Sequence, residues 1–343
     1  MHDVDLISAP SGRRPTLERV ATRAGVSRAT ASRVVNGSAA VSDEVRDAVL
    51  RAVGELGYVP NQAARSLVTH RTDTFALVLS EPGGRVFSDD PFFPTLVHGA
   101  IEELEEADKE LVLLRADTER SRERIRRYAA GGYVDGVLVT SMRSDDPLPG
   151  TLARMGVPVV VNGWSRGGPN VPCVDVANAD GARLAVRRLV NAGRRRIATI
   201  AGPQDMVGGI DRLAGYCAEM TASKRRPIVA VGDFTRESGT VAMRQLLAAE
   251  PRLDAVFVAS DLMAHGALRA LRQAGRRVPD DVAVIGFDDT GESRYTEPPL
   301  TTVHQPVLDI GKTMVRQVLR SAGGEAVEPS IVLATELVVR ESA

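Results

Sequence analysis

The chain has 343 residues, with 43 lysines and arginines against 44 aspartates and glutamates, so it is long enough for two or three domains and has no overall basic character. No apolar run reaches transmembrane length and the polar start is unlike a signal peptide, which argues against a membrane protein and favours a cytoplasmic one with a disordered tail over residues 1–14. Cys173 and Cys217 are far apart and fit no metal-binding spacing, so we expect buried thiols, no metal site and no cofactor.

Residues 15–58 predict three short helices. Apolar residues recur at helical spacing from Leu17 to Ala24, and Gly25 can enter the left-handed conformation that ends a helix. Ser27 can cap a second helix, and a third is expected to run from a Ser42 cap to Gly57. Two short helices joined by a glycine turn are typical of a helix-turn-helix, whose second helix lies in the major groove of DNA.

The outward side of the second helix carries the residues expected to contact DNA. Arg28, Ala29 and Arg33 would face the groove floor, where arginine can bind guanine through two hydrogen bonds and alanine can touch a thymine methyl group. Short polar side chains suited to phosphate contacts lie beside them, namely Ser27, Thr30, Ser32 and Asn36. The alternative is an ordinary helical bundle with surface arginines. The caps, the glycine turn and the ten arginines against five acidic residues between positions 12 and 71 together favour DNA binding.

Two segments resemble a known family. GVSRATASRVVNG, at residues 25–37, is close to the signature of the DNA-binding headpiece of the LacI (lactose/galactose repressor) family, with Ala31 where valine is common. GYVPNQAARSL, at residues 57–67, resembles the hinge of that family, and the similarity continues through nearly the whole chain. We therefore expect a hinge over residues 59–73. The set of DNA-binding candidates is completed by Thr16, Tyr58, Asn61, Ala64 and Leu67.

The hinge segment from Pro60 to Leu67 would make fewer than two helical turns. A helix that short is not stable alone in water, so we expect it to fold only when it is held, as a switch element would. The resemblance implies that two such helices, one from each protomer of a homodimer, pair over the centre of a pseudo-palindromic operator. It also implies that Leu67 wedges into the minor groove and kinks the duplex. The alternative is that Leu67 caps the core of the next domain.

From Thr74 onward, short apolar runs alternate with amphipathic helical patterns. The expected strands are Phe75–Ser80, Leu111–Arg115, Gly136–Thr140, Val157–Val161, Ile197–Ala201, Pro227–Val231, Ala255–Ser260 and Val282–Phe287. Continuous apolar strands between helices indicate parallel sheets covered on both faces. Residues 74–343 are therefore predicted to form a two-lobed α/β effector-binding and dimerisation domain that resembles the type I periplasmic-binding-protein fold. The chain is expected to cross between the lobes near residues 162–176, near 300–306 and again toward the C-terminus.

Polar and aromatic residues at the expected strand ends are candidates for effector binding, because ligands of such folds lie in the crevice at the carboxyl ends of the strands. They are Phe92, Phe93, Thr140, Asn162, Arg212, Phe234, Ser260, Asp288 and Gln305. The resemblance places Arg212 facing the cleft, where its guanidinium can grip vicinal hydroxyls or a carboxylate. It also gives Asp288 the role of accepting hydrogen bonds from ligand hydroxyls.

Each of these candidates has a structural alternative. Phe92 and Phe93 can staple a helix to the sheet, Arg212 can form a surface salt bridge, and Asp288 can belong to a structural or magnesium-binding carboxylate pair. Ser260 stands where many family members have asparagine, which weakens any transfer of ligand identity. An arginine, a carboxylate and stacking aromatics suit a sugar or sugar phosphate, and a purine or nucleoside would also fit them.

The sequence predicts a transcriptional regulator, most simply a repressor, that acts on double-stranded operator DNA under the control of a small carbohydrate effector. It carries no recognisable catalytic motif, so we expect no enzyme. A leucine heptad tail is missing, which favours a dimer over a tetramer. The alternatives are a sugar-binding receptor, which would need no headpiece, and a sugar-modifying enzyme, which would need a nucleophile or a metal set.

Overall fold

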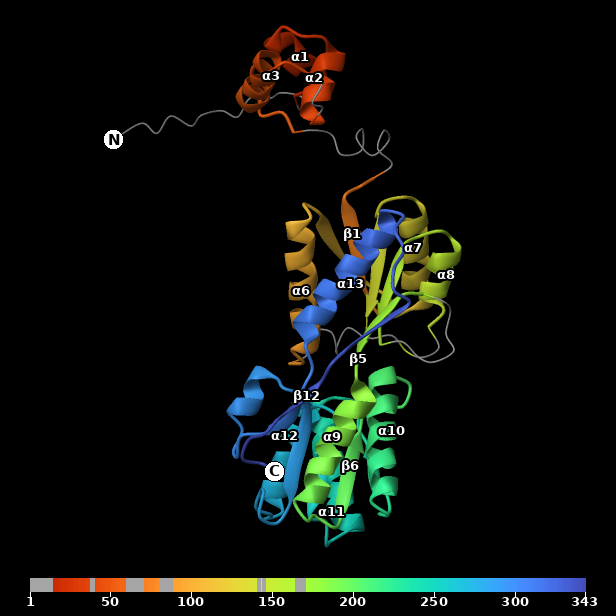
Figure 1. Ribbon diagram of the computed structural model, residues 1–343, viewed down its shortest axis with the longest axis vertical. Coiled ribbons are helices and arrows are strands. Elements are labelled where there is room, and N and C mark those ends of the chain that lie inside the picture. The colour runs from red at the N-terminus through yellow and green to blue at the C-terminus, as the bar shows by residue number, and fades with distance from the viewer. Residues whose placement is uncertain are drawn as a thin grey trace, which may run out of the picture. The chain divides into compact units, whose positions relative to one another are not determined.

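The computed structural model describes residues 15–37, 41–59, 71–80, 89–140, 143, 146–163 and 171–343 (Figure 1). The chain divides into two compact units, Met1–Thr72 and Asp73–Ala343. The predicted hinge residues Asn61, Ala64 and Leu67 lie outside the described residues.

The described residues of the first unit form the helices α1 (Leu17–Ala24), α2 (Arg28–Val35) and α3 (Asp43–Leu56). The predicted caps of the first two are confirmed, because Thr16 Oγ1 accepts from the amide of Arg19 at 3.4 Å and Ser27 Oγ accepts from that of Thr30 at 3.1 Å. Ser42 stands at the N-cap position of α3, but its side chain makes no cap hydrogen bond. Gly25 and Gly57 end α1 and α3 in the left-handed conformation, with φ of 67° and 58°. Small apolar side chains from all three helices form the buried core.

The second unit contains two lobes, each built on a six-stranded sheet. The strands of the first lobe are β1 (Thr74–Leu79), β2 (Glu110–Arg115), β3 (Gly136–Thr140), β4 (Val159–Asn162), β5 (Cys173–Val176) and β11 (Ser330–Leu333). Its helices are α6 (Phe92–Glu106), α7 (Glu119–Ala130), α8 (Leu148–Arg154) and α13 (Val307–Ala322). The strand order is β11-β5-β4-β3-β1-β2, and every pairing is parallel.

The second lobe has the strands β6 (Ile197–Ala201), β7 (Val229–Val231), β8 (Ala255–Val258), β9 (Ala283–Asp288), β10 (Thr301–His304) and β12 (Glu336–Val338). Its helices are α9 (Asn178–Asn191), α10 (Val207–Ala222), α11 (Arg236–Ala249) and α12 (Asp261–Gln273), with the 3₁₀ helix η1 (Gly291–Arg294). The order is β12-β10-β9-β8-β6-β7. The predicted parallel sheet is confirmed except for β12, which runs antiparallel to β10.

Both faces of each sheet are covered by helices, as the continuous apolar strands predicted. Along β1, Phe75 and Leu77 pack in the core under α6 and α13, whereas Ala76 and Val78 point to the opposite core under α7 and α8. Successive side chains of a strand point to opposite faces, so a strand buried on both sides must be apolar at every position. In the second lobe, α11 and α12 cover one face and α9 and α10 the other.

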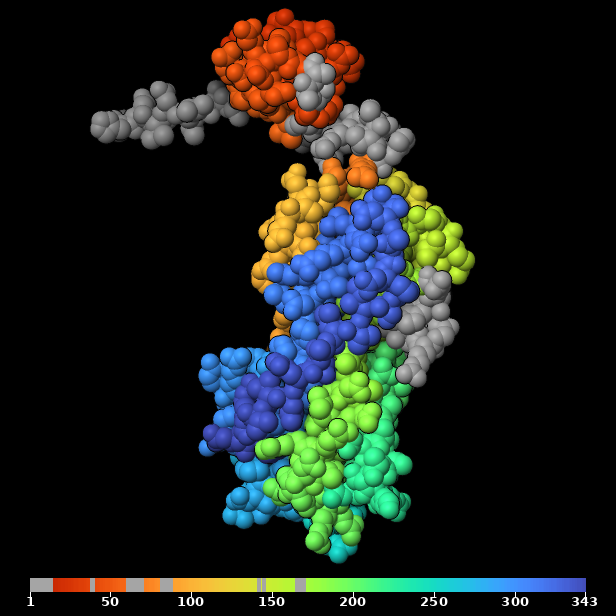
Figure 2. All heavy atoms as spheres, viewed as in Figure 1, coloured from red at the N-terminus to blue at the C-terminus, as the bar shows by residue number. Residues whose placement is uncertain are grey.

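The described strands and helices of the second unit alternate between the two lobes at three points of the chain. The chain leaves the first lobe after β5, returns between β10 and α13, and passes again between β11 and β12. Residues 173–176, predicted to belong to the first crossing, instead form strand β5 of the first sheet. Figure 2 shows the C-terminal residues, in blue, spread over both lobes.

The pair α11 and α12 packs through glycines. A Cβ atom added to Gly239 would overlap the carbonyl oxygen of Met263, and one added to Gly266 would overlap that of Arg236. The two helix backbones are therefore in direct contact, which leaves no room for even a methyl group.

We predict that Gly239→Ala destabilises the second unit by about 1–3 kcal/mol, because an overpacked core must shift its backbone. Gly291→Ala is the control: a Cβ there meets no atom within 4 Å, and the free energy of unfolding should change by no more than about 0.5 kcal/mol. Urea unfolding of the two variants and the unmodified chain measures this difference. Equal stability of the two variants would mean that α11 and α12 are not packed this closely.

Candidate functional sites

The second helix of the first unit presents the side chains expected to contact DNA. Arg28, Ala29 and Arg33 are exposed, and neither guanidinium has an interaction with another described residue. These exposed side chains are therefore available to contact another molecule.

The polar residues around them are partly engaged with one another. The Ser27 and Thr30 hydroxyl groups are 2.8 Å apart, and the Asn36 amide donates to Ser32 Oγ at 3.3 Å. Thr16 is exposed, whereas Tyr58 is half-buried and packs against the core of the three helices.

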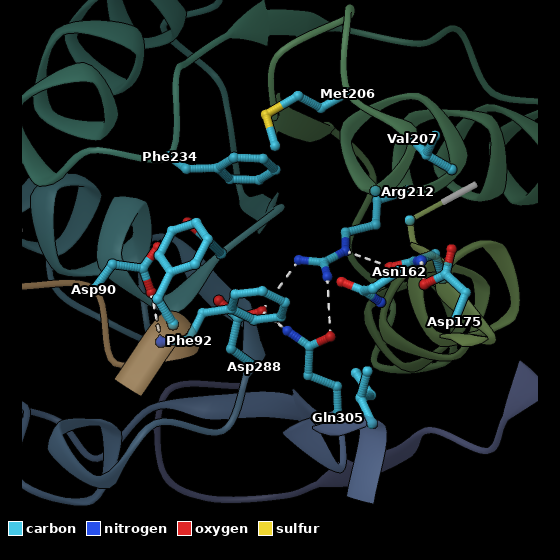
Figure 3. A pocket seen from close by; sticks show the side chains of 16 residues that line it. Asp90, Phe92, Asn162, Asp175, Met206, Val207, Arg212, Phe234, Asp288 and Gln305 are labelled. Carbon is cyan, nitrogen blue, oxygen red and sulfur yellow. Dashed lines mark hydrogen bonds and ion pairs between the residues drawn. The ribbon is translucent and has the colours of Figure 1, made fainter. Parts of the chain in front are cut away.

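A cavity of about 100 Å³ lies between the two lobes of the second unit, at the carboxyl ends of their strands. Eight of the nine predicted effector residues line it, namely Phe92, Phe93, Asn162, Arg212, Phe234, Ser260, Asp288 and Gln305. Figure 3 shows side chains from both lobes pointing into it. The ninth, Thr140, is fully buried outside the lining, where its hydroxyl donates to Asn162 Oδ1 at 3.1 Å. Thr140 therefore does not line this cavity but supports Asn162 from behind.

The guanidinium of Arg212 is the centre of the polar network in this cavity. Its Nε donates to Asn178 Oδ1 at 2.8 Å, and its Nη1 donates to the carbonyl oxygen of Ala259 at 2.7 Å and to Asp288 Oδ1 at 3.1 Å. Its Nη2 donates to Gln305 Oε1 at 3.4 Å, and Gln305 Nε2 donates in turn to Asp288 Oδ1 at 2.6 Å (Figure 3). Arg212 is only 6% exposed, so the alternative of a surface salt bridge is wrong.

Aromatic rings enclose the same guanidinium. The Arg212 Cζ atom lies 3.6 Å from the centroid of the Phe287 ring and 6.0 Å from that of Phe234. Phe234 has a φ of 68°, a left-handed conformation that costs a non-glycine residue about 1–2 kcal/mol. Asp288 likewise has a positive φ, of 117°. Residues with strained backbone conformations are concentrated at functional sites, so these two residues favour a functional role for the cavity.

Two carboxyl groups in the cavity have altered acidity. Burial raises the pKa of Asp175 to about 6, and the amide of Val176 and the charge of Arg212 oppose this rise only in part. Burial also raises the pKa of Asp288 above its ordinary value, against the opposing charge of Arg212. Burial lowers the pKa of Arg212 itself. Buried polar groups are in surroundings of low dielectric constant, which strengthens the hydrogen bonds that they offer to a ligand.

Other residues of the lining were not selected from the sequence. They are Asp90, Gly163, Asp175, Asn178, Met206, Val207, Gly208 and Ile310. Asp90 lies just before α6, and its carboxylate accepts from the amide of Phe92, the first residue of that helix, at 3.0 Å. Asp175 and Asn178 flank the first crossing. The sequence feature that could have identified them is the occurrence of two polar residues at the end of a buried strand.

No helix among the described residues is long and apolar enough to cross a membrane. Within the same residues, no group of three or more histidine, cysteine, aspartate or glutamate side chains is arranged to hold a metal ion. Asp289, the neighbour of Asp288, is instead bound by Arg340 at 2.5 Å and lies 3.3 Å from His304.

A helix-turn-helix unit joined to a two-lobed domain with a polar cavity between its lobes defines a DNA-binding regulator with a ligand-binding domain. Residues 16–61 match the model of bacterial regulatory proteins of the lacI family, and residues 186–343 match that of a periplasmic binding protein-like domain. The chain is 51% identical over 336 residues to the HTH-type transcriptional regulator CelR of Thermobifida fusca. The aligned residues cover 96% of this chain and 98% of that regulator. The chain belongs to the lacI family of bacterial regulatory proteins, and it is a DNA-binding transcriptional regulator as the sequence predicted.

Solved structures agree with this assignment over the whole fold. A transcriptional regulator CelR–cellobiose complex is 49% identical, with a TM-score of 0.76 over 96% of this chain and 100% of that chain. A Lac repressor dimer bound to operator and the anti-inducer ONPF is 30% identical, with a TM-score of 0.87 over 96% of this chain and 99% of that chain. The predicted two-part architecture is confirmed by both.

The raised pKa of Asp175 predicts a dependence of stability on pH. The unfolded chain releases this proton near the ordinary aspartate pKa of 3.8, whereas the folded chain keeps it up to about pH 6, so folding loses stability as pH rises through this interval. Relative to Asp175→Asn, the unmodified chain should therefore have a higher unfolding free energy at about pH 4.5 than at about pH 6.5. Urea unfolding at both pH values measures it, and a difference that does not vary with pH would contradict the buried carboxylic acid.

Proposed function

We propose that this regulator is a repressor that binds a pseudo-palindromic operator as a homodimer, and that a carbohydrate in the cavity between the lobes alters its affinity for DNA. The exposed Arg28, Ala29 and Arg33 of α2 would read base edges, while Ser27 and its polar neighbours would contact phosphates. The Lac repressor dimer bound to operator, which shares this fold, supports the dimeric arrangement.

The observation that carries the carbohydrate assignment is the network of Arg212, Asp288 and Gln305 between aromatic side chains. A sugar presents hydroxyl groups in fixed directions around a ring that has apolar C–H faces. Phe92 and Phe234 offer flat surfaces for such faces, and the carboxylate and amide offer acceptors and donors for the hydroxyls. The 49% identical CelR structure, a complex with cellobiose, supports the same ligand class.

We infer that the cavity binds its ligand without transforming it. Glycoside hydrolysis needs one carboxylic acid that reaches the glycosidic oxygen and a second, free carboxylate. Asp288 is occupied by Arg212 and Gln305, and Asp175 Oδ1 accepts from the amide of Val176 at 2.7 Å and from Asn178 at 3.1 Å. These carboxyl groups act as parts of a rigid wall. The regulators among the relatives support a binding protein over an enzyme.

Coupling to DNA would pass through the crossings between the lobes. Asn178 follows the first crossing and Gln305 lies on the second, and both are bound by Arg212. A ligand that rearranges these contacts changes the angle between the lobes, which both protomers transmit to their headpieces. Such coupling is typically about 1–3 kcal/mol, and it is reciprocal.

The DNA-reading role of α2 predicts a specific defect in Arg33→Ala. Loss of a bidentate contact to guanine should weaken operator binding by about 1–3 kcal/mol and binding to random DNA much less. Fluorescence anisotropy with an operator selected from random sequence, over a range of salt concentrations, measures both. Arg51→Ala is the control, because it removes the same charge from an exposed position on α3. Equal losses on both DNAs, or the same loss in the control, would show that Arg33 reads no base.

The carbohydrate assignment predicts that at least one member of a panel of mono- and disaccharides raises the unfolding temperature of the full chain, since it binds only the folded state. The same sugar should change operator affinity by about 5–150-fold, and operator should change sugar affinity by the same factor. Phe234→Gly removes the ring at a position whose φ of 68° suits glycine. The free energy of sugar binding should therefore fall by more than the free energy of unfolding of the free protein. A panel of purines and nucleosides run in parallel decides the ligand class, and a shift with these alone would overturn the proposal.

A further inference from the structure

The edge of the second sheet that lies opposite the cavity is strongly basic. The strands β6, β7, β8 and β9 run parallel, so the loops that precede them meet at one edge, whereas the cavity lies at their carboxyl ends. These loops, residues 192–196, 223–228, 250–254 and 274–282, are here called the basic edge, and they lie at the lower end of the second lobe in Figure 1.

The basic edge has a large excess of positive charge. Runs of basic residues at 194–196, 224–226 and 276–277, together with Arg252, give nine positive charges, against four negative ones from Glu250, Asp254, Asp280 and Asp281. The loop before the next strand of the sheet, residues 295–300 before β10, has no lysine or arginine, so the basic surface ends there. The formal net charge of +5 is therefore concentrated on one edge of a chain whose overall charge is -1.

Hydrogen bonds between the loops join them into one surface. Arg194 donates to the carbonyl oxygen of Pro279 at 2.7 Å, and Arg276 donates to that of Leu253 at 2.8 Å. Because these acceptors are backbone carbonyls, the bonds fix the loops relative to one another without neutralising either guanidinium.

The acidic residues and the helix dipoles offset only part of the excess. Ion pairs join Glu250 to Arg196 at 2.7 Å, and Asp280 and Asp281 to Arg277 at 3.3 and 3.0 Å. The fourth acidic residue is bound by two backbone amides. Helices α9, α10, α11 and α12 end at this edge, and each helix end is equivalent to about half a negative charge, or about two in all. About three of the five excess positive charges therefore remain.

Four basic side chains of this edge are exposed, namely those of Arg195, Lys224, Arg226 and Arg252. None of them has an ion pair or a side-chain hydrogen bond with another described residue. Guanidinium groups bind phosphate well because their N–H groups match the spacing of its oxygens. The loops contain no aromatic residue, although aromatic side chains anchor most protein partners and stack on the bases of single-stranded nucleic acid. Duplex DNA, which presents rows of phosphates, is the polyanion that fits this surface best.

We propose that the basic edge binds the phosphate backbone of a second DNA duplex while the helix-turn-helix unit holds the operator. The two DNA-binding surfaces are separate, because α2 and the basic edge belong to different compact units. The second contact reads no base sequence, since phosphate contacts position a duplex without specifying it. A regulator bound to its operator can thus hold another DNA segment at the same time.

The test uses the full chain saturated with unlabelled short operator duplex, to which a fluorescent duplex of random sequence is added. Fluorescence anisotropy over a range of salt concentrations should show that this second duplex binds, with a Kd of about 1–100 μM that weakens as salt rises. Arg195→Ala/Arg226→Ala removes two exposed charges from neighbouring loops of the basic edge. Arg120→Ala/Arg124→Ala is the charge-matched control, on the exposed side of α7 in the first lobe.

The variant of the basic edge should bind the second duplex at least about tenfold more weakly at about 0.1 M salt, and its slope of log affinity against log salt concentration should be less steep by about two. The control should bind it as the unmodified chain does, and both variants should keep their operator affinity and their unfolding temperature. Absence of binding by the operator-saturated protein, or equal losses in the two variants, would overturn the proposal. Polyglutamate that binds more tightly than DNA at equal charge would assign the surface to an acidic protein and overturn it as well.

Discussion

The second unit depends on one buried charge, the guanidinium of Arg212. A charge removed from water is costly unless hydrogen bonds and opposite charge compensate it, and truncating one partner leaves the other uncompensated. Arg212 meets this demand with Asn178, the Ala259 carbonyl oxygen, Asp288 and Gln305, while Phe287 covers its face. These partners come from the start of α9, the end of β8, the end of β9 and the second crossing. One side chain thus fixes the relative positions of four segments at the floor of the cavity.

The same arrangement explains how a small ligand can have a long-range effect. Asp288 Oδ1 already accepts from both Arg212 and Gln305, so a ligand hydroxyl at this carboxylate must share or replace those bonds. Gln305 stands on a crossing between lobes, and any change in its hydrogen bonds acts where the lobes are joined. A ligand can shift the conformation only by the difference in its binding free energy between two states. Residues that bridge the crossings are where such a difference arises.

The walls of the cavity are built at the expense of backbone strain. Phe234 and Asp288 adopt positive φ values that ordinary residues avoid, and Asp289 does so too, with φ of 55°. Helix α11, which follows Phe234, is itself fixed, because its backbone is in direct contact with that of α12 at Gly239 and Gly266. Rigid support of this kind reduces the entropy that a ligand must overcome when it binds.

Much of the fold could be predicted from the sequence because its signals are local. The caps at Thr16 and Ser27, the left-handed Gly25 and the apolar period of α1 to α3 depend on neighbours within a turn or two. The uninterrupted apolar strands predicted sheets buried on both faces, and motif resemblance placed eight residues on one cavity. Asn162 and Asp288 end strands and Gln305 follows one, and parallel pairing brings such strand ends to a common edge of each sheet.

Tertiary structure decided which of the polar residues near strand ends reach the cavity. Thr140 and Asn162 look alike as polar residues at the ends of neighbouring strands, yet only Asn162 reaches the cavity while Thr140 is buried behind it. Asp175 and Asn178 carry no periodic signal, and they matter because the first crossing brings them to Arg212, which is remote in sequence. The antiparallel pairing of β12 with β10 likewise depends on where the chain returns to the second lobe. Local patterns report which side of an element is buried, but a site between lobes is set by contacts between segments that the sequence keeps far apart.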